Sequence, residues 1–278
     1  MQHKVIVVLV DGLSAEVAHC MGYLAGMVEA GQGLQATLSC ALPSLSRPLY
    51  ECILTGTTPV ESGITHNGVS RLSRQESIFH LARAGGKRTA AAAYHWISEL
   101  YNQSPWQAAR DRFTHDERLP IQHGCFYWDD GYPDSHLLMD GEWLRSQYDP
   151  DFLLIHPMGV DDAGHRFGLD SRQYRNQARR MDSLLADLLP QWLAEGYQVV
   201  ITSDHGMNND LSHGGTLTEE RRVPLWLFGD AFVAQWPAGP AMQQTQLCAL
   251  MADLLGVSHD KPGCPPLLKA GNLPEVHC

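Results

Sequence analysis

The sequence lacks an excess of basic side chains. It has 20 Lys and Arg against 31 Asp and Glu, a formal net charge of -11. A nucleic-acid-binding surface needs surplus Lys and Arg to neutralise phosphates, so we expect no nucleic-acid polymer as a partner. A small phosphorylated substrate still fits this charge, because bound metal cations can reverse the sign of the field inside one cleft.

Paired cysteines and long apolar runs are also missing. The seven cysteines are an odd number and none stands in a CxxC pair, which favours a reducing compartment over a disulfide framework. The first apolar run, residues 5–10, ends at Asp11 and is too short for a signal peptide or a membrane span. We therefore expect a cytoplasmic location and no membrane partner, and the sequence predicts no oligomeric state.

Apolar β-branched runs alternate with segments of helical periodicity. Runs that end at turn residues predict strands buried on both faces at 5–10, 152–155 and 197–202, with weaker candidates at 89–93 and 223–228. Helices are expected at 15–30, 77–84, 171–194 and 242–255, and Pro190 should kink or end the third. Strands that alternate with helices predict an α/β fold with a mainly parallel central sheet.

The domain organisation follows from length and composition. The 278 residues suffice for a full hydrophobic core, and we expect a single catalytic domain over residues 1–278. Residues from about 95 to 150 are rich in aromatics and have little periodicity. We expect them to form a small insertion or long loop on the substrate side.

Acidic and histidine side chains follow three of the predicted strands. Asp11 follows the first, Asp161 and His165 follow the strand at 152–155, and Asp204 and His205 follow the strand at 197–202. The carboxyl ends of parallel strands meet at one edge of a sheet, where ligands bind. Carboxylate and imidazole together suit Zn²⁺, with Mn²⁺ or Fe²⁺ as alternatives.

Each of these features also has a simpler interpretation. A single Asp after a strand is usually a helix N-cap or a turn former. Asp161 and His165 would equally fit an ion pair on a helix surface. The joint occurrence at three strand ends favours a metal site.

A hydroxyl nucleophile is suggested by residues 43–48, Pro-Ser-Leu-Ser-Arg-Pro. A serine at the start of a helix beside a cation is activated, because the metal favours the alkoxide and backbone N–H groups face the incoming oxyanion. Taken alone, such a serine is more often a helix cap.

These motifs, in this order, resemble the alkaline phosphatase superfamily, and most closely its nucleotide pyrophosphatase/phosphodiesterase branch. Val10-Asp11-Gly12 is similar to the first metal-ligand segment. Residues 43–48 followed by Leu54-Thr55-Gly56 resemble the nucleophile segment, and counting back from Thr55 selects Ser46 over Ser44. Residues 60–67 resemble the next segment, whose terminal Asn67 contacts a phosphoryl oxygen.

The resemblance implies a three-layer α/β/α sandwich and a hydrolase of phosphodiester or phosphoanhydride bonds that acts through a phospho-seryl intermediate. It implies two divalent metal ions, most suitably Zn²⁺, with Mn²⁺ as the alternative. Asn67 and the backbone N–H after Ser46 would stabilise the phosphoryl oxygens. One metal, which activates the attacking water, would be held by Asp161, His165 and His213, and the other by Asp11, Asp204, His205 and Ser46.

Several alternatives stay open at this point. The branch usually has Thr where this chain has Ser46. A sulfatase would need Arg where Tyr50 stands, so that assignment is disfavoured. A phosphomonoesterase or a phosphonate hydrolase could share the same metal core, and Arg47 is the nearby cation that a monoester could use. A metal-stabilised binding protein is the alternative that is not an enzyme.

The substrate-side region carries aromatics from Tyr94 to about residue 133. We hypothesise that one of them, with Trp128 as the candidate, stacks on a nucleobase or another flat group. Core packing is the simpler interpretation for any single ring. The substrate is thus expected to be a small phosphorylated molecule such as a nucleotide. Asp162 is expected to be a helix N-cap or a group that orients a metal ligand, and His66 and His156, which stand near the motif residues, are assigned no role.

Overall fold

A single eight-stranded sheet runs through the computed structural model, which describes residues 2–269. Its strands follow one another in space in the order β2-β8-β7-β1-β6-β3-β5-β4. Their bounds are β1 (Lys4–Leu9), β2 (Gly33–Ser39), β3 (Thr89–Tyr94), β4 (Phe113–His115), β5 (His123–Tyr127), β6 (Phe152–Ile155), β7 (Tyr197–Thr202) and β8 (Arg222–Phe228).

The centre of the sheet is parallel. The five neighbouring strands β7, β1, β6, β3 and β5 all run in one direction. At the edges, β8 pairs antiparallel with β7, β2 with β8, and β4 with β5. This confirms the expected mainly parallel sheet, and it brings the carboxyl ends of five strands to one edge.

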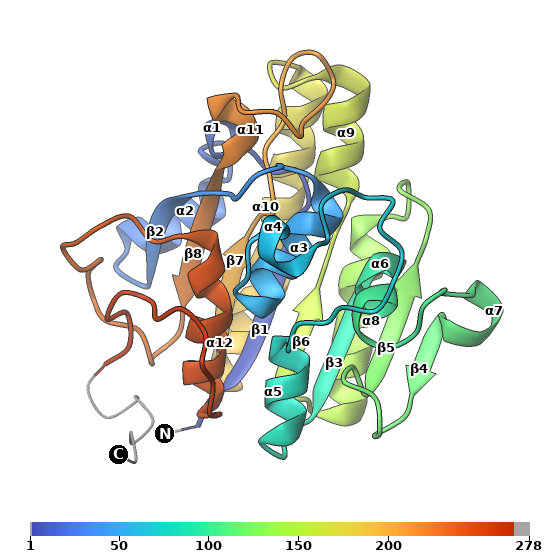
Figure 1. Cartoon of the computed structure of the whole chain (residues 1–278). Helices are drawn as coiled ribbons and strands as arrows, with labels where there is room; N and C mark the ends of the chain where they lie inside the picture. Colours follow the sequence, from blue (N-terminus) through green and yellow to red (C-terminus); the bar gives the residue numbers. More distant parts are fainter. Residues whose placement is uncertain (1, 270–278) are drawn as a thin grey trace.

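Helices cover both faces of the sheet (Figure 1), which confirms the three-layer sandwich. Alternate residues of β1 feed the two cores: Val5 and Val7 point to one cluster, Ile6 and Val8 to the other. The first cluster contains α3 (Ser46–Thr55), α5 (Ile78–Ala84), α6 (His95–Tyr101) and α12 (Leu247–Leu255), and the second contains α1 (Ala15–Ala18), α2 (Gly22–Glu29), α8 (Asp134–Tyr148), α9 (Gly159–Phe167) and α10 (Arg172–Ala194). Short turns of helix lie in the connections: α4 (Pro59–Ser62), α7 (Ala108–Asp111), α11 (Thr218–Arg221) and the 3-10 turn η1 (Gln244–Gln246).

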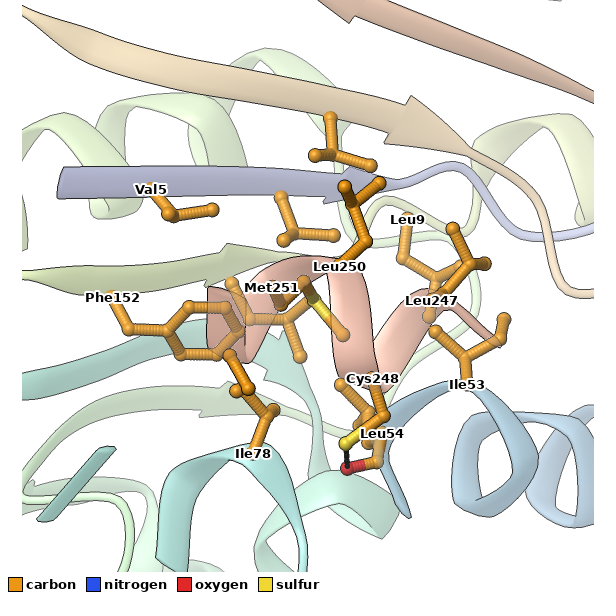
Figure 2. Close-up of a cluster of buried hydrophobic side chains, with 14 of the residues drawn as sticks. Val5, Leu9, Ile53, Leu54, Ile78, Phe152, Leu247, Cys248, Leu250 and Met251 are labelled. Atoms are coloured by element: carbon orange, nitrogen blue, oxygen red, sulfur yellow. Dashed lines mark hydrogen bonds between the residues drawn. The ribbon is translucent and has the colours of Figure 1, made fainter. Parts of the chain in front are cut away.

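Helix α12 packs against the centre of the sheet. Figure 2 shows its side chains, among them Leu247 and Leu250, directed toward β1 with Leu9 beside them. Leu250 is fully buried. Burying a leucine of this kind stabilises the fold by roughly 1.5–3 kcal/mol, so α12 holds β1 in place from the face opposite α10.

The helix expected over residues 15–30 is divided in two, so that prediction is wrong as a single element. The chain leaves helical conformation after α1, and α2 begins at Gly22. The carboxylate of Asp182 on α10 accepts the N–H groups of Tyr23 at 2.7 Å and Leu24 at 3.0 Å. A distant side chain therefore caps a second helix start that the local sequence did not reveal.

Pro190 does not end α10, which continues to Ala194. The last turn is held by Trp192, which is fully buried and donates its indole N–H to Glu142 of α8. Tertiary packing there outweighs the loss of one helical hydrogen bond at proline.

Residues 95–150 differ from the expected insertion or loop. They form α6, α7, β4, β5 and α8, and β5 pairs directly with β3 in the central sheet. The segment was hard to assign because β5 and β4 are short and α8 is only weakly amphipathic. Strand β2 was also missed, since its exposed and buried positions do not alternate regularly.

Within residues 2–269, no helix has both the length and the apolar character needed to cross a membrane. The six cysteines of the same part of the chain are all free thiols, and Cys278 lies outside the described residues.

Candidate active site

The carboxyl edge of the parallel sheet gathers the predicted acidic and histidine residues. Asp11 follows β1, Asp161 and His165 lie on α9 after β6, and Asp204 and His205 follow β7. Two groups place their ligand atoms within 4.8 Å of one another. They are Asp11 with Asp204 and His205, and Asp161 with His205 and His213.

A glycine allows the first strand end to approach α9. Gly12 has φ of +68°, and a Cβ there would lie 2.7 Å from Oδ1 of Asp161 and 2.8 Å from its Cα. Any side chain at position 12 would both strain the backbone and displace Asp161. The Asp11-Gly12 turn therefore brings the carboxylates of two different strand ends together.

The three histidines share one hydrogen-bonding arrangement. In each ring Nδ1 faces a backbone carbonyl, which can only accept, so Nδ1 carries the hydrogen and Nε2 keeps its lone pair. This is the tautomer in which imidazole binds a metal through Nε2. The pairs are His205 with the Gly206 carbonyl at 2.8 Å, His213 with Ser44 at 2.7 Å, and His165 with Leu211 at 2.9 Å.

Each of the three carboxylates also keeps one oxygen available for a metal. Asp11, Asp161 and Asp204 each have one buried oxygen without a hydrogen-bond partner among residues 2–269: Oδ1, Oδ1 and Oδ2 respectively. The other oxygen of Asp11, Oδ2, is hydrogen-bonded to Tyr50 and His156. The other oxygen of Asp204, Oδ1, accepts the backbone N–H of Gly12. Buried polar atoms without a partner are costly, and three in one place fit a bound cation.

Burial shapes the charges of this site. Burial raises the pKa of Asp11 to about 7. It raises the pKa values of Asp161 and Asp204 well above the usual range, and repulsion between neighbouring carboxylates raises them further. It lowers the pKa of His205 strongly and that of His213 to about 4, so both rings are neutral. Within the described chain, the ion-pair partners of these carboxylates are histidines. Divalent cations would supply the missing positive charge.

His165 is brought to the site but stays outside both tight groups. Its Nε2 lies 3.4 Å from Oδ2 of Asp161, and the side chain is 44% exposed. His213 Nε2 lies 3.9 Å from Oδ1 of Asp161, and its ring stacks on His205 with centroids 3.5 Å apart. The division of ligands between two metals therefore stays a prediction.

Ser46 is the first residue of α3, and its hydroxyl does not cap that helix. The N-cap position is held by Leu45, whose side chain makes no capping hydrogen bond. The Oγ of Ser46 lies instead 3.0 Å from Nε2 of His205. The interpretation of Ser46 as a helix cap is therefore wrong, and its hydroxyl lies among the metal-binding groups.

Asn67 lies next to the nucleophile in an arrangement that was not expected. Its Oδ1 accepts the backbone N–H of Arg47 at 3.0 Å. This N–H, which was expected to face the phosphate, is thus engaged in the structure. The contact orients the amide of Asn67 so that its NH₂ group is the donor left for a phosphoryl oxygen.

Arg47 is a structural residue. It is 3% exposed, pairs with Glu99 at 2.8 Å, and its guanidinium lies 4.6 Å from the ring centre of Trp96. It also donates to the carbonyl of Val69 at 3.0 Å. All of these contacts turn the cation away from a phosphate, so Arg47 does not serve as the extra cation of a monoesterase here.

Tyr50 and His156 are site residues that sequence reasoning missed. The hydroxyl of Tyr50 and Nε2 of His156 both bond Oδ2 of Asp11. A signal existed for Tyr50, because it stands four residues after Ser46 on one helix and so shares its face. His156 directly follows β6, the strand next to β1, and thus lies at the same sheet edge.

The predicted aromatic region is divided between core and surface. Phe126 and Tyr127 are buried, and Tyr127 donates to the carbonyl of His156 at 2.7 Å. Trp128 is 47% exposed, with Trp106 5.7 Å away and the guanidinium of Arg112 over its ring. Of Phe126, Tyr127 and Trp128, Trp128 is the one with an exposed ring, and its role in stacking stays a prediction.

Comparison with curated proteins reveals relatives much longer than this chain. The catalytic subunit of human GPI ethanolamine phosphate transferase 2 is 25% identical over 281 residues, which cover 95% of this chain and 27% of that protein. GPI ethanolamine phosphate transferase 2 of Aspergillus fumigatus is 22% identical and matches 82% of this chain and 30% of its own length. The chain therefore spans under a third of these relatives.

Among solved structures, the murine ectonucleotide pyrophosphatase/phosphodiesterase 5 is similar, with a TM-score of 0.71 at 14% identity, covering 94% of this chain and 97% of that one. Its inactive form in complex with AMP has a TM-score of 0.72. This likeness establishes an alkaline phosphatase-like fold.

The family model described as type I phosphodiesterase/nucleotide pyrophosphatase matches residues 5–213. That match covers most of the chain, which therefore belongs to the type I phosphodiesterase/nucleotide pyrophosphatase family of the alkaline phosphatase superfamily.

Proposed function

We propose that the chain is a metal-dependent hydrolase of phosphodiester or phosphoanhydride bonds, with Ser46 as its nucleophile. The observation that carries the proposal is the position of Ser46 Oγ. It does not cap α3, and it lies 3.0 Å from His205 Nε2, among the side chains proposed to bind metal. Family membership and fold support a phosphoryl-transfer enzyme in general. The type of bond that is cleaved, the identity of the metal and the catalytic mechanism are proposed here.

Two zinc ions are the proposed cofactors. Asp11, Asp204 and His205 would hold one, and Asp161, His213 and His165 the other, as the unpartnered carboxylate oxygens and the Nε2 lone pairs suggest. When bound, the metals supply positive charge that favours the Ser46 alkoxide and the departing oxygen.

The chain's own groups account for the rest of the proposed mechanism. Ser46 Oγ forms a bond to phosphorus while the bond to the leaving oxygen breaks, which gives a phospho-seryl enzyme. Water then attacks phosphorus and Ser46 Oγ leaves. The NH₂ group of Asn67 donates to a phosphoryl oxygen in both steps, held in place by its bond to Arg47 N–H.

The substrate is proposed to be a small phosphorylated molecule. A structural neighbour has been solved in complex with AMP, which supports a nucleotide as one candidate, with Trp128 as the stacking group. A cytoplasmic location belongs to the proposal as well, and it rests on the cysteine usage.

A second candidate is transfer of the phosphoryl group to an acceptor alcohol. The relatives that match 95% and 82% of this chain are named as ethanolamine phosphate transferases. Hydrolase and transferase share the attack by Ser46 and differ only in whether water or an alcohol takes the group from it. Product analysis after adding an alcohol such as glycerol would separate them, since a transferase forms a glycerol ester at the expense of free product.

The main test uses bis-(p-nitrophenyl) phosphate with parallel analysis of bound metal. Wild-type protein should release p-nitrophenolate, Ser46→Ala should not, and both should contain the same metal. Ser46→Thr is the matched control and should retain activity, because either hydroxyl can attack phosphorus. A panel of monoesters, diesters and phosphonates would then define the bond type. Equal, non-zero rates for wild type and Ser46→Ala would contradict Ser46 as the nucleophile. A wild type that holds metal yet cleaves nothing would favour a metal-stabilised binding protein.

A further inference from the structure

A buried ion pair lies directly beside the nucleophile. The guanidinium of Arg47, the residue after Ser46, pairs with Glu99 at 2.8 Å, and both side chains are buried. Taking two charges out of water is costly, and well-packed apolar side chains in their place often give equal or greater stability. The pair is therefore better explained by what it holds in place than by the stability that it adds.

Arg47 contacts the turn that carries Asn67 at two points. Its backbone N–H donates to Oδ1 of Asn67 at 3.0 Å, and its guanidinium donates to the carbonyl of Val69 at 3.0 Å. The N–H of Val69 donates to the carbonyl of His66 at 3.1 Å, which closes a four-residue turn that contains Asn67. The position of this turn therefore depends on the side chain of Arg47 as well as on its backbone.

The same helix face holds the chain that follows this turn. Glu51 stands four residues after Arg47 on α3, so the two side chains share one face of the helix. The buried carboxylate of Glu51 accepts the hydroxyl of Ser73. Helix α3 therefore carries Ser46 at its first position and holds residues 67–73 along the face that begins with the next residue.

Glu99 fixes the guanidinium from α6. Its carboxylate accepts the backbone N–H of Trp106 at 3.2 Å in addition to the ion pair. Burial raises the pKa of Glu99, but hydrogen bonds from Ser70 and Trp106 and the neighbouring guanidinium lower it on balance, so the carboxylate is ionised at neutral pH. The ring of Trp96, also on α6, lies 4.6 Å from the guanidinium of Arg47. Arg47 is thus held between α6 and the turn at residues 66–69.

We propose that Arg47 and Glu99 are positioning residues for phosphoryl transfer: their ion pair fixes the turn at residues 66–69 and so directs the NH₂ group of Asn67 toward the phosphoryl oxygen. The inference rests on the proposed function and adds two residues that do not touch the substrate. A hydrogen-bond donor stabilises a transition state only when it is correctly placed, and a displacement of about 1 Å can cost about 100-fold in rate. The pair therefore acts on kcat through Asn67.

A double-mutant cycle with metal-loaded protein and bis-(p-nitrophenyl) phosphate tests this. Arg47→Met keeps the length of the side chain and removes its charge and its donors. We expect Asn67→Ala to lower kcat by about 100–1,000-fold and Arg47→Met by about 10–100-fold, with KM and zinc content nearly unchanged. The protein with both changes should match Asn67→Ala, because no amide is left to position. Losses that multiply in this protein would show that Arg47 acts independently of Asn67 and would overturn the inference.

Arg145→Met is the matched control. Arg145 is also buried and pairs with Glu142 at 2.9 Å, but it lies in the last turn of α8, which leads into the start of β6 and not to its carboxyl end. Its loss should lower Tm and leave kcat at the wild-type value. Breaking a buried pair can also prevent folding. Glu99→Gln is therefore the second variant, since it keeps the shape and an acceptor for Trp106. It should lower kcat by a smaller factor than Arg47→Met, and a wild-type kcat would contradict the role of the ion pair.

The placement of Asn67 can also be followed without turnover. In protein labelled with ¹⁵N at asparagine, the NMR signals of the Asn67 NH₂ group are identified by their loss in Asn67→Ala. They should shift in Arg47→Met and Glu99→Gln and stay in place in Arg145→Met. Signals that do not move in Arg47→Met would overturn the inference whether or not the protein is active. A metal-loaded wild type that cleaves no phosphodiester, with signals that move as expected, would contradict the proposed function and still support the positioning of Asn67.

Discussion

The Nε2 of His156 lies 2.9 Å from Oδ2 of Asp11, with both side chains fully buried. The hydroxyl of Tyr50 donates to the same oxygen. Two hydrogen bonds thus hold Oδ2, and Oδ1 has no hydrogen-bond partner in the described chain. A hydrogen bond from a neighbouring residue fixes the direction in which a metal ligand points. Tyr50 and His156 therefore determine the orientation of the Asp11 carboxylate.

Tyr50→Phe removes one of these bonds with little change in volume. We expect the affinity for Zn²⁺ to fall by about 10–100-fold, the usual effect of losing such a partner. Competition with a chromophoric chelator measures it. Tyr101→Phe is the matched control: Tyr101 is also buried but donates to Glu51, at 2.8 Å, so its loss should lower stability and leave zinc affinity unchanged. Equal zinc affinities in wild type and Tyr50→Phe would contradict the role of Tyr50.

Metal binding should release protons at neutral pH. The pKa of Asp11 is about 7 and those of Asp161 and Asp204 are well above the usual range, so the metal-free protein keeps protons on these carboxyls that the bound metal displaces. His205 and His213 are already neutral and release none. Calorimetric titration in buffers of different ionisation enthalpy counts the protons, and Asp11→Asn should release fewer.

The stability of the metal-free protein depends on pH through the same carboxyl groups. A carboxyl whose pKa is raised by folding stabilises the metal-free protein fully below about pH 4, and this contribution is lost as pH rises through about 7 for Asp11. The stabilisation by added zinc, measured as the rise in Tm, should therefore grow between pH 6 and pH 8. A zinc effect that is constant over this range would contradict the assignment.

Gly12→Ala should disrupt the metal site while the fold persists. The new methyl group would lie less than 3 Å from Asp161, and the left-handed backbone would be strained. We expect loss of bound zinc and of phosphodiesterase activity, with far-UV circular dichroism unchanged. Gly31→Ala separates the two causes, because Gly31 has φ of +71° with no atom within 4 Å of the added Cβ. Retention of zinc by Gly12→Ala would show that Asp161 can move without loss of the site.

Leu250→Ala should destabilise the protein without changing its chemistry. Leu250 is fully buried between α12 and β1 (Figure 2), so truncation leaves a cavity and costs about 2–5 kcal/mol of unfolding free energy. Leu72→Ala, at a side chain that is 46% exposed, should change it by no more than about 0.5 kcal/mol. Urea denaturation of metal-loaded protein measures both, and kcat/KM at low temperature should equal that of wild type.

The sequence alone determined the strands that carry the site. The runs that became β1, β6 and β7 are mostly apolar, with Gln198 and Thr202 as the polar residues of β7, and an acidic side chain follows each of them: Asp11, Asp161 and Asp204. Because parallel strands share one carboxyl edge, this local information sufficed to bring Asp11, Asp161 and Asp204 together. The family resemblance then distinguished Ser46 from Ser44.

Only the tertiary structure decided which groups face one another. His156 is 145 residues from Asp11 and Asp182 is 159 from Tyr23, so neither contact leaves a periodic pattern. Arg47 stands beside the nucleophile in sequence, yet its side chain turns into the core to Glu99. The physical reason is that strand and helix periodicity specify which face a residue occupies, whereas hydrogen bonds between side chains depend on how distant elements pack. The strand ends were therefore readable from the sequence, and the partners that orient the ligands were not.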